Sequence, residues 1–237
     1  MILLASKSAG RLATLRAAGI TPRVQVSEVD EPAVLTKLAA AAARSGAPAP
    51  GPAEQVQALA RAKAHAVAST LSPEDLAGDP ALIVVGCDSM LEIDGQVIGK
   101  PRSPQAARER WLAMRGRSGV LHTGHTVIRG RDGESVEGVS STIVHFAFPS
   151  EAEIEVYIAT QEPLWCAGAF TIDGLGGAFI EGVEGDPHGV VGLSLPLLRR
   201  LVCELGVTWT DLWDLGAGTP GTQPAASDAP TSREARP

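Results

Sequence analysis

Polar and charged side chains follow the apolar segments of this 237-residue sequence at several points. Ligands bind at strand ends in open α/β sheets, so such residues are the first candidates for a functional site. Lysine and arginine pair with phosphate groups there, and carboxylates provide the hard oxygen ligands that Mg²⁺ prefers. The residues at the ends of predicted strands are Ser6 and Ser8, Asp30 and Glu31, Asp88 and Ser89, and Lys100.

The charged residues near these strand ends are of the types that bind a phosphorylated ligand and a divalent metal. The cations placed to meet phosphates are Lys7, Arg11, Lys63 and Lys100, and the carboxylates placed to hold a divalent metal are Asp30, Glu31 and Asp88. A metal-bound water beside a carboxylate base is an arrangement that hydrolyses phosphoanhydrides. The stretch "ASKSAGR" (5–11) also joins a predicted strand to a helix, whose N-terminus favours an anion.

Each of these residues also has a purely structural explanation. Ser8 is in place to cap the helix that follows it, and Asp30-Glu31 fits a solvated strand end. Lys63 fits a side chain that reaches water from the edge of a helix. Asp88 differs because it comes just after the apolar run "LIVVG" (82–86), and a buried carboxylate needs a partner or a metal. The functional explanation is therefore favoured for Asp88.

Other candidate motifs are weaker. The glycines of "GLGG" (174–177) lack the spacing and the helix opening of a dinucleotide fingerprint. The five histidines form no HxxxH or HExxH pair, which favours core or surface roles for them. Cys87 has no histidine near it in sequence that would activate a thiol nucleophile.

The periodicity of the chain predicts helices that alternate with strands, which is typical of the α/β class. We expect strands at 2–5, 24–29, 82–86, 90–93, 96–98, 120–128 and 136–148, and helices at 9–18, 53–70, 104–115, 151–160 and 196–205. Asp94-Gly95 predicts a hairpin turn, and Lys63 falls in the middle of an apolar helix face. The small-residue stretch 45–53 predicts a loop, and the glycine-rich segment 166–186 predicts short strands that alternate with tight turns.

Composition excludes several classes of protein. A net charge of −7 argues against a protein that coats nucleic acid, because phosphate contacts need clustered lysine and arginine. Three widely spaced cysteines without a CxxC pair indicate neither a disulfide framework nor a zinc site, and they fit a reducing cytoplasm. The first apolar run is one strand long and Lys7 follows it, so we expect no targeting segment and no membrane partner.

Ordered motifs along the chain resemble the Maf family of nucleoside triphosphate pyrophosphatases. They are "LLASKSAGRL" (3–12), "EVDE" (28–31), "ALARAKA" (58–64), "VVGCDS" (84–89), "IGKP" (98–101), "EVYIATQEPLWCAGAFTIDGLGGAFIEGVEGD" (155–186) and "VVGLSLPLL" (190–198). The resemblance implies a Maf/ITPase-like α/β fold with an elongated mixed β-sheet flanked by helices, and two lobes with a central cleft. It implies one domain over residues 1–212 and a homodimer, and the composition of 213–237 predicts a disordered tail.

The resemblance also implies a reaction and a site. Water attacks the α-phosphate of a nucleoside triphosphate with a divalent metal cation, Mg²⁺ or Mn²⁺, and gives monophosphate and pyrophosphate. Asp88 matches the proton acceptor, and Glu31 together with Asp88 matches the metal-binding carboxylates. The positions that match substrate binding are Ser6, Ser8, Arg11, Lys63 and Lys100.

Three positions depart from the family pattern. Gly10 stands where an arginine is usual, Ser89 where a threonine is usual, and Asp173 where the usual residue is a glutamine. These positions are tied to nucleotide choice in the family. An aspartate in place of an amide removes a donor and adds a charge, so the resemblance does not carry over a preference for dTTP and UTP or for 7-methyl-GTP.

Three functions compete on these grounds. The leading one is a house-cleaning hydrolase that removes surplus or non-standard nucleotides. The alternative is a non-catalytic nucleotide-binding regulator linked to cell division and septum formation, and the third is a phosphohydrolase that releases single phosphates. Glu31, Lys63 and Asp88 favour an enzyme, because a sensor needs no base beside a metal site.

Overall fold

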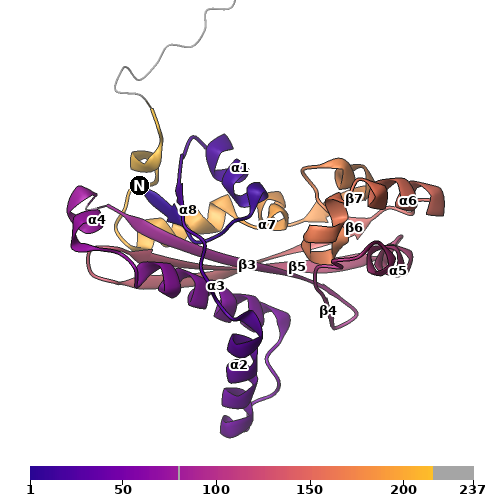
Figure 1. Ribbon diagram of the computed structural model, residues 1–237, viewed down its shortest axis with the longest axis horizontal. Helices are drawn as coiled ribbons and strands as arrows, with labels where there is room; N and C mark the ends of the chain where they lie inside the picture. Colours follow the sequence, from indigo (N-terminus) through magenta and orange to yellow (C-terminus); the bar gives the residue numbers. More distant parts are fainter. Residues whose placement is uncertain (80, 216–237) are drawn as a thin grey trace, which may run out of the picture.

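The computed structural model describes residues 1–79 and 81–215 of the chain. An elongated mixed β-sheet runs along the longest dimension of the molecule, and helices cover both of its faces (Figure 1). The strands are β1 (Ile2–Leu4), β2 (Arg23–Val24), β3 (Ile83–Ile93), β4 (Gln96–Ile98), β5 (Ser118–Arg129), β6 (Ser135–Phe146) and β7 (Ile180–Glu184). The expected α/β class with a mixed sheet is confirmed.

The sheet order is β2-β1-β3-β5-β6-β7, with β4 paired to β3 outside this path. β1 runs parallel to both β2 and β3, whereas the pairs β3–β5, β5–β6 and β6–β7 are antiparallel. The long strands β3, β5 and β6 therefore run from one end of the molecule to the other (Figure 1).

The helices are α1 (Ala9–Ala17), α2 (Glu31–Ser45), α3 (Pro52–Ala68), α4 (Pro73–Gly78), α5 (Pro104–Met114), α6 (Glu151–Ala159), α7 (Pro187–Val191) and α8 (Leu195–Glu204). There are also short 3₁₀ turns, η1 (Glu162–Trp165), η2 (Ala167–Ala169) and η3 (Leu175–Phe179) between α6 and β7, and η4 (Trp209–Leu212) after α8. Serine side chains cap α1, α5 and α6, which confirms the predicted starts of these three helices. No helix in this described part of the chain has both the length and the apolarity to cross a membrane.

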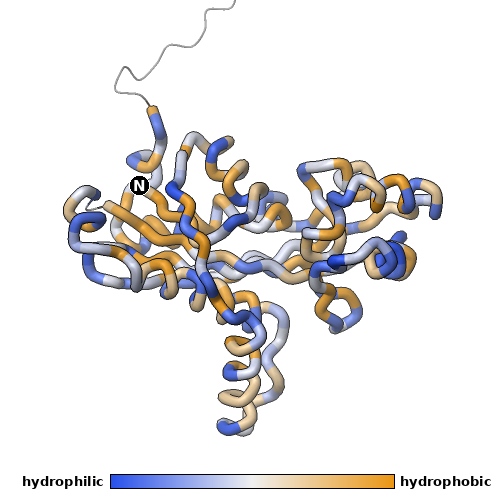
Figure 2. The backbone as a smooth tube through the Cα atoms, viewed as in Figure 1, coloured by the Kyte–Doolittle hydropathy of each residue, from blue (hydrophilic) through white to orange (hydrophobic). Residues whose placement is uncertain are grey.

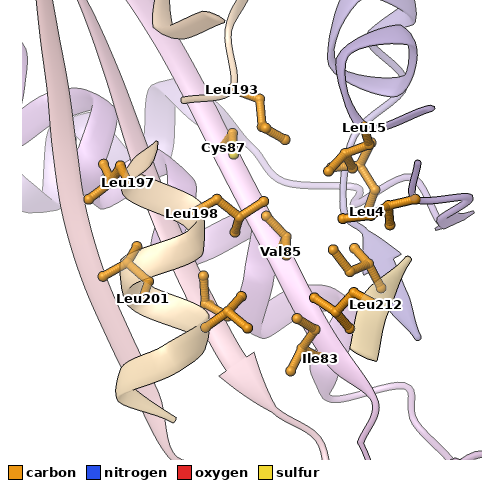
Figure 3. Close-up of a cluster of buried hydrophobic side chains, with 14 of the residues drawn as sticks. Leu4, Leu15, Ile83, Val85, Cys87, Leu193, Leu197, Leu198, Leu201 and Leu212 are labelled. Atoms are coloured by element: carbon orange, nitrogen blue, oxygen red, sulfur yellow. The ribbon is translucent and has the colours of Figure 1, made fainter. Parts of the chain in front are cut away.

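Apolar side chains form separate cores at the two ends of the sheet. At one end, Val85 and Cys87 of β3 point between α1 and α8 (Figure 3), and Val84 packs on the other face against α3. Strand β1 and the first half of β3 there carry hydrophobic colouring (Figure 2). At the other end, Trp111 of α5 lies among the rings of Phe146, Tyr157 and Phe179 in edge-to-face contacts.

One edge of β3 is left open in its middle. β5 pairs with 83–92 on the opposite edge, while β1 pairs with 83–85 and β4 pairs with 91–93. Residues 86–90, here called the edge gap, have no strand partner on this side among the described residues. Because β1 is parallel and β4 antiparallel to β3, both strands end beside the edge gap. The chain then continues from them to Ser6 and to Lys100.

Two strand-end predictions are wrong. Asp88 and Ser89 lie in the middle of β3, because the predicted strands at 82–86 and 90–93 are one continuous strand. The strand predicted at 24–29 extends only over Arg23–Val24. Asp30 and Glu31 instead start α2, where the Asp30 side chain accepts a hydrogen bond from Ala33 N at 3.0 Å.

Two other segments differ from the expectation. The glycine-rich stretch 166–186 contains the 3₁₀ turns η2 and η3 and a single strand, β7, rather than several short strands. Helix α2 was not predicted; it contributes no buried residue and projects from the body beside the 46–51 loop (Figure 1). At the C-terminal side, Asp214 N donates to Gly19 O at 2.7 Å, and most of the predicted tail, 216–237, lies outside the described residues.

Candidate active site

Three charged side chains meet on the α3 face of the sheet, and we call them the carboxylate–lysine cluster. Lys63 Nζ lies 2.5 Å from Asp88 Oδ1 and 2.7 Å from Glu31 Oε1. The Lys63 and Asp88 side chains are only 13% and 12% exposed, whereas that of Glu31 is 50% exposed. The lysine therefore compensates two carboxylates at the border between the protein interior and solvent.

Two glycines bring α3 close enough for this contact. A Cβ on Gly86 would lie 2.4 Å from Ala60 O, and a Cβ on Gly124 would lie 2.5 Å from Val56 O. The backbone of α3 therefore rests directly on β3 and β5 at these positions. Gly124 is the strand partner of Asp88, so α3 passes close to that carboxylate and Lys63 on the same helix reaches it.

Glu31 enters the cluster from the first turn of α2. Burial raises the pKa of its carboxyl group, but the hydrogen bond and charge of Lys63 and the charges of Lys100 and Arg102 outweigh this, so the pKa is lowered. Asp30 does not take part, because its carboxylate caps α2. Of the two acidic residues predicted here, the structure brings only Glu31 to the cluster.

Arg11 is held by three acceptors on the opposite face of the sheet. Its Nη1 donates to Ser6 Oγ at 3.0 Å, its Nη2 to Ser89 Oγ at 3.1 Å and its Nε to Gly192 O at 2.7 Å. The side chain is buried although it is charged. Such a guanidinium is fixed in one orientation before any ligand arrives.

The hydroxyl of Ser89 continues this arrangement into the sheet. Ser89 Oγ and Thr123 Oγ1 are 2.8 Å apart, and Thr123 Oγ1 donates to Gly189 O at 2.8 Å. Ser89 therefore accepts from Arg11 and donates to Thr123, so every hydroxyl proton has an acceptor. We call Ser6, Arg11, Ser89 and Thr123 the Arg11 network.

The turn between β1 and α1 is held by its own hydroxyls. Ser6 Oγ accepts from Ser8 N at 3.2 Å, and Ser8 Oγ accepts from Arg11 N at 3.4 Å. The structural explanation for Ser8, a helix N-cap, is therefore confirmed. Lys7 is exposed at the tip of the turn.

The two groups of residues meet at the edge gap of β3. Successive side chains of a strand point to opposite faces, so Asp88 faces α3 and Ser89 faces α1. Both lie where no strand among the described residues pairs with that edge of β3. A ligand at this opening is therefore within reach of the carboxylate–lysine cluster on one side and of the Arg11 network on the other.

Lys100 is exposed and close enough to Glu31 for its charge to lower the pKa of that carboxyl group. Arg102 does the same and was missed by the sequence analysis. Its backbone is left-handed, with φ of 60°, and its N–H donates to Leu164 O at 3.1 Å. The only signal for it was its position two residues after Lys100. No sequence pattern indicated Thr123 or Gly192. They are far from Arg11 in the chain, and only the fold brings Gly192 to Arg11 and Thr123 to Ser89.

His125 is buried next to the Arg11 network and has a structural role. Its Nδ1 lies 3.1 Å from Thr123 O, and its Nε2 accepts from Ser194 N at 2.9 Å. Burial lowers the pKa of this imidazole to about 4, despite the Thr123 carbonyl, which favours the charged form. The neutral ring therefore joins β5 to the start of α8.

A family model described as Maf-like protein matches residues 1–205 of the chain. The chain belongs to the Maf family. Three relatives carry the name nucleoside triphosphate pyrophosphatase. The relative from Salinispora tropica is 50% identical over 224 residues, covering 93% of this chain and 92% of the relative. The relative from Rhodococcus erythropolis is 50% identical over 217 residues, with 90% and 96% covered, and that from Saccharopolyspora erythraea is 52% identical over 215 residues, with 89% and 96% covered.

The three positions that depart from the Maf pattern are near one another in the structure. A Cβ on Gly10 would lie 3.7 Å from Asp173 Oδ2, and Gly10 directly precedes Arg11, which binds Ser89. Asp173 is exposed and has no hydrogen bond or ion pair to another described residue. The Asp173 carboxylate therefore lies close to the start of α1, beside the Arg11 network, where a Cβ on Gly10 would also lie 3.0 Å from Val191 Cγ1.

The residues present fit the divalent metal that the Maf family implies. Three or more metal-ligating side chains do not cluster anywhere in 1–79 or 81–215. However, Mg²⁺ is usually held by one or two carboxylates together with substrate phosphates and water. Glu31 and Asp88 supply that number of carboxylates, and each uses only one oxygen toward Lys63.

Proposed function

We propose that this protein hydrolyses nucleoside triphosphates to monophosphate and pyrophosphate with the help of a divalent metal cation, as a house-cleaning enzyme of the nucleotide pool. The name of its relatives supports the nucleoside triphosphate pyrophosphatase activity. The observation that carries the proposal is the Lys63–Asp88 pair at the edge gap, directly beside the Arg11 network. A base for water and an anion-binding group are thereby adjacent.

The polyphosphate is bound by the groups around the edge gap. Arg11, Lys63 and Lys100 supply positive charge, while Ser6 and Ser8 supply polar groups at the N-terminus of α1. That helix end also favours an anion, because its first N–H groups point outward. Arg11 needs little reorganisation, since its three acceptors already fix it.

Asp88 is the proton acceptor. Its Oδ1 is held by Lys63, and its Oδ2 has no hydrogen-bond partner among the described residues. Oδ2 is free to take a proton as the water oxygen forms a bond to the α-phosphorus. The bond from the α-phosphorus to the bridging oxygen breaks, and pyrophosphate leaves with that electron pair.

Glu31 and Asp88 would hold the metal, Glu31 through the carboxylate oxygen that faces away from Lys63 and Asp88 through Oδ1, so that Asp88 Oδ2 stays available for the proton. A divalent cation there supplies neutralisation of phosphate charge and lowers the pKa of a bound water. Lys63 keeps the two carboxylates apart and compensated when no cation is present.

Base selection is assigned to Gly10, Ser89 and Asp173. The carboxylate of Asp173 only accepts hydrogen bonds, so it favours a base edge that presents N–H donors. Gly10 offers no side-chain group to the base, and a Cβ there would lie 3.0 Å from Val191 Cγ1. Replacing the usual amide and arginine in this way removes two hydrogen-bond-donating side chains from the pocket.

Product analysis tests the proposal. The purified protein is incubated with ordinary, deoxy and base-modified nucleoside triphosphates, with Mg²⁺ or Mn²⁺ and then with a chelator, and all phosphate products are quantified. We expect monophosphate and pyrophosphate that disappear with chelator and fall about a hundredfold or more in Asp88→Asn. Asp132→Asn, which alters an exposed carboxylate paired with Arg129, is the matched control.

Other results would select another function. Release of single phosphates indicates a different phosphohydrolase. Binding of a triphosphate without turnover indicates a nucleotide-binding regulator linked to cell division, and it removes the role of Asp88. No contact in the described structure favours either of these over the pyrophosphatase.

We further propose a cytoplasmic homodimer built from one domain over residues 1–212. The absence of a disulfide between the three free cysteines supports a reducing compartment. Light scattering checks the assembly, because a dimer has about twice the chain mass of 24.5 kDa.

A further inference from the structure

The carboxylate of Glu162 is surrounded by hydrogen-bond donors. Its Oε1 accepts from Thr171 Oγ1 at 2.5 Å, from Gly176 N at 3.0 Å and from Tyr157 Oη at 3.0 Å. Its Oε2 accepts from Leu175 N at 3.1 Å. A carboxylate can accept about four hydrogen bonds, and this one accepts four, three of them on Oε1. Three of its four donors belong to the segment 171–176.

The segment 171–176 is shaped around this carboxylate. A Cβ on Gly174 would lie 2.8 Å from Glu162 Oε2, and a Cβ on Gly176 would lie 2.4 Å from Tyr157 Oη. The chain therefore passes Glu162 and Tyr157 closely at two glycines. Burial raises the pKa of Glu162, but the hydrogen bonds from Thr171, the two backbone N–H groups and Tyr157 outweigh this and lower it.

Asp173 lies inside this segment, between the donors Thr171 and Leu175. Its side chain is exposed, and Oδ2 points to the place where a Cβ on Gly10 would be, at 3.7 Å. Asp173 itself forms no hydrogen bond with another described residue that would fix it. Its position beside the Arg11 network therefore depends on how the backbone of its segment is held.

Resting on the proposed function, we propose that Glu162 is a positioning residue for base selection. It does not touch the substrate; it anchors both ends of the segment that carries Asp173, so that this carboxylate meets the nucleobase in one orientation. Loosening the anchor spreads Asp173 over several positions. Hydrogen bonding to the base then loses its directionality, while the phosphate-binding residues stay where they are.

The experiment measures kcat/KM of the full chain for GTP, ATP, CTP, UTP and dTTP, and takes the ratio of the best to the poorest substrate. Glu162→Gln places an amide N–H₂ among donors, and Asp173→Ala removes the carboxylate that reads the base. We expect each variant to lower the ratio about tenfold, since small misplacements of a binding group cost one to two orders of magnitude. The double variant should lie within about twofold of Asp173→Ala, because Glu162 acts through Asp173.

Two further variants distinguish loss of the Glu162 anchor from a general defect in folding. Thr171→Val removes one hydroxyl donor from the segment and should lower the ratio in the same direction as Glu162→Gln. Tyr157→Phe removes a donor that belongs to α6, leaves the three contacts of the segment intact, and should keep the ratio near that of the wild type. Thermal melting of every variant shows that it is folded.

Several results would overturn the inference. They are additive effects of Glu162→Gln and Asp173→Ala, equal losses for all five nucleotides in Glu162→Gln, or a wild-type enzyme that does not discriminate among bases. If the wild type forms no monophosphate from any nucleotide, the proposed function fails first, and this outcome is recognised by the missing product rather than by a changed ratio.

Discussion

Lys63 is the side chain on which most of the site depends. It contacts both carboxylates of the cluster and is mostly buried, so it serves as the internal counter-charge of Asp88 and Glu31. The possibility that it merely reaches water from a helix edge is excluded by these contacts. A lysine in this position holds the cluster together without substrate and meets a phosphate when one is bound.

Replacing Lys63 by glutamine should impair both stability and activity. The change leaves two carboxylates facing each other without a cation, which costs about 1–3 kcal/mol of the free energy of unfolding. We expect kcat/KM for a nucleoside triphosphate to fall by about two orders of magnitude, since one charge contact to phosphate and the orientation of Asp88 are both lost. Urea unfolding and steady-state kinetics measure the two effects.

The matched control is Lys37→Gln, which neutralises an exposed lysine of α2. This variant should change the free energy of unfolding by less than about 0.5 kcal/mol and kcat/KM by less than about twofold. An unchanged kcat/KM in Lys63→Gln would contradict the role given to this residue.

Among the helices, α3 has the greatest influence on the site because it delivers Lys63. Around Val56 and Ala60 its backbone lies directly on two glycines of the sheet. Helix α2 contributes only through its first turn, where Glu31 joins the cluster, and none of its residues is fully buried. The distance between α3 and β3 therefore determines whether Lys63 and Asp88 can meet.

Gly86→Ala tests this close approach. The added Cβ would lie 2.4 Å from Ala60 O and 2.8 Å from Ala64 Cβ, so α3 must move away from the sheet. Overpacking of this kind costs about 1–3 kcal/mol of stability, and the displaced Lys63 should lower kcat at least about tenfold. Thermal melting and kinetics of the same preparation measure both losses.

Gly78→Ala, in α4, is the control for Gly86→Ala. A Cβ at Gly78 meets nothing within 4 Å, so stability should change by less than about 0.5 kcal/mol and activity should be retained. Equal stability and equal activity of the two alanine variants would show that the position of α3 does not depend on glycine at residue 86.

The described chain as a whole forms a long sheet (Figure 1). It has an apolar core at each end, and the polar site lies between them. The edge gap of β3 occurs there because β1 and β4 are both short and occupy opposite ends of one edge. Buried polar contacts such as His125–Ser194 join this centre to the surrounding helices. The residues of the site therefore also make contacts that hold the sheet and its helices together.

His125 makes the stability of the whole fold depend on pH. Its pKa is about 4 in the folded protein because of burial, against a usual value of 6.5, so between these values the unfolded chain binds more protons. Its contribution is fully present above pH 6.5 and is lost as the pH falls toward 4, by about 3 kcal/mol in total. Urea unfolding from pH 7 to pH 4 measures this loss.

His125→Gln should flatten this dependence. Glutamine can still offer an acceptor to Ser194 N–H, but it does not titrate. We expect the free energy of unfolding of this variant to fall less steeply between pH 6.5 and 4 than that of the wild type. Parallel curves for the two proteins would mean that other groups dominate the acid response.

Much of the site could be predicted because its signals are local. The hydroxyls of "ASKSAGR" (5–11) follow a strand and start a helix, and the helical spacing of 53–70 placed Lys63 on an apolar face. Asp88 was singled out because it follows apolar residues, although it lies within the strand rather than at its end. Patterns of burial and capping depend on neighbours within a few residues, so the sequence shows them directly.

Only the tertiary structure decided which of these residues meet. Arg11 contacts Ser89, which is 78 positions away, and Gly192, which is 181 positions away. It also decided that Asp30 caps a helix while Glu31 reaches Lys63, and that Asp173 lies beside Gly10. These outcomes depend on strand order, on the edge gap and on the close packing of α3. Such long-range contacts form through the pairing and burial of distant segments, which no short stretch of sequence encodes.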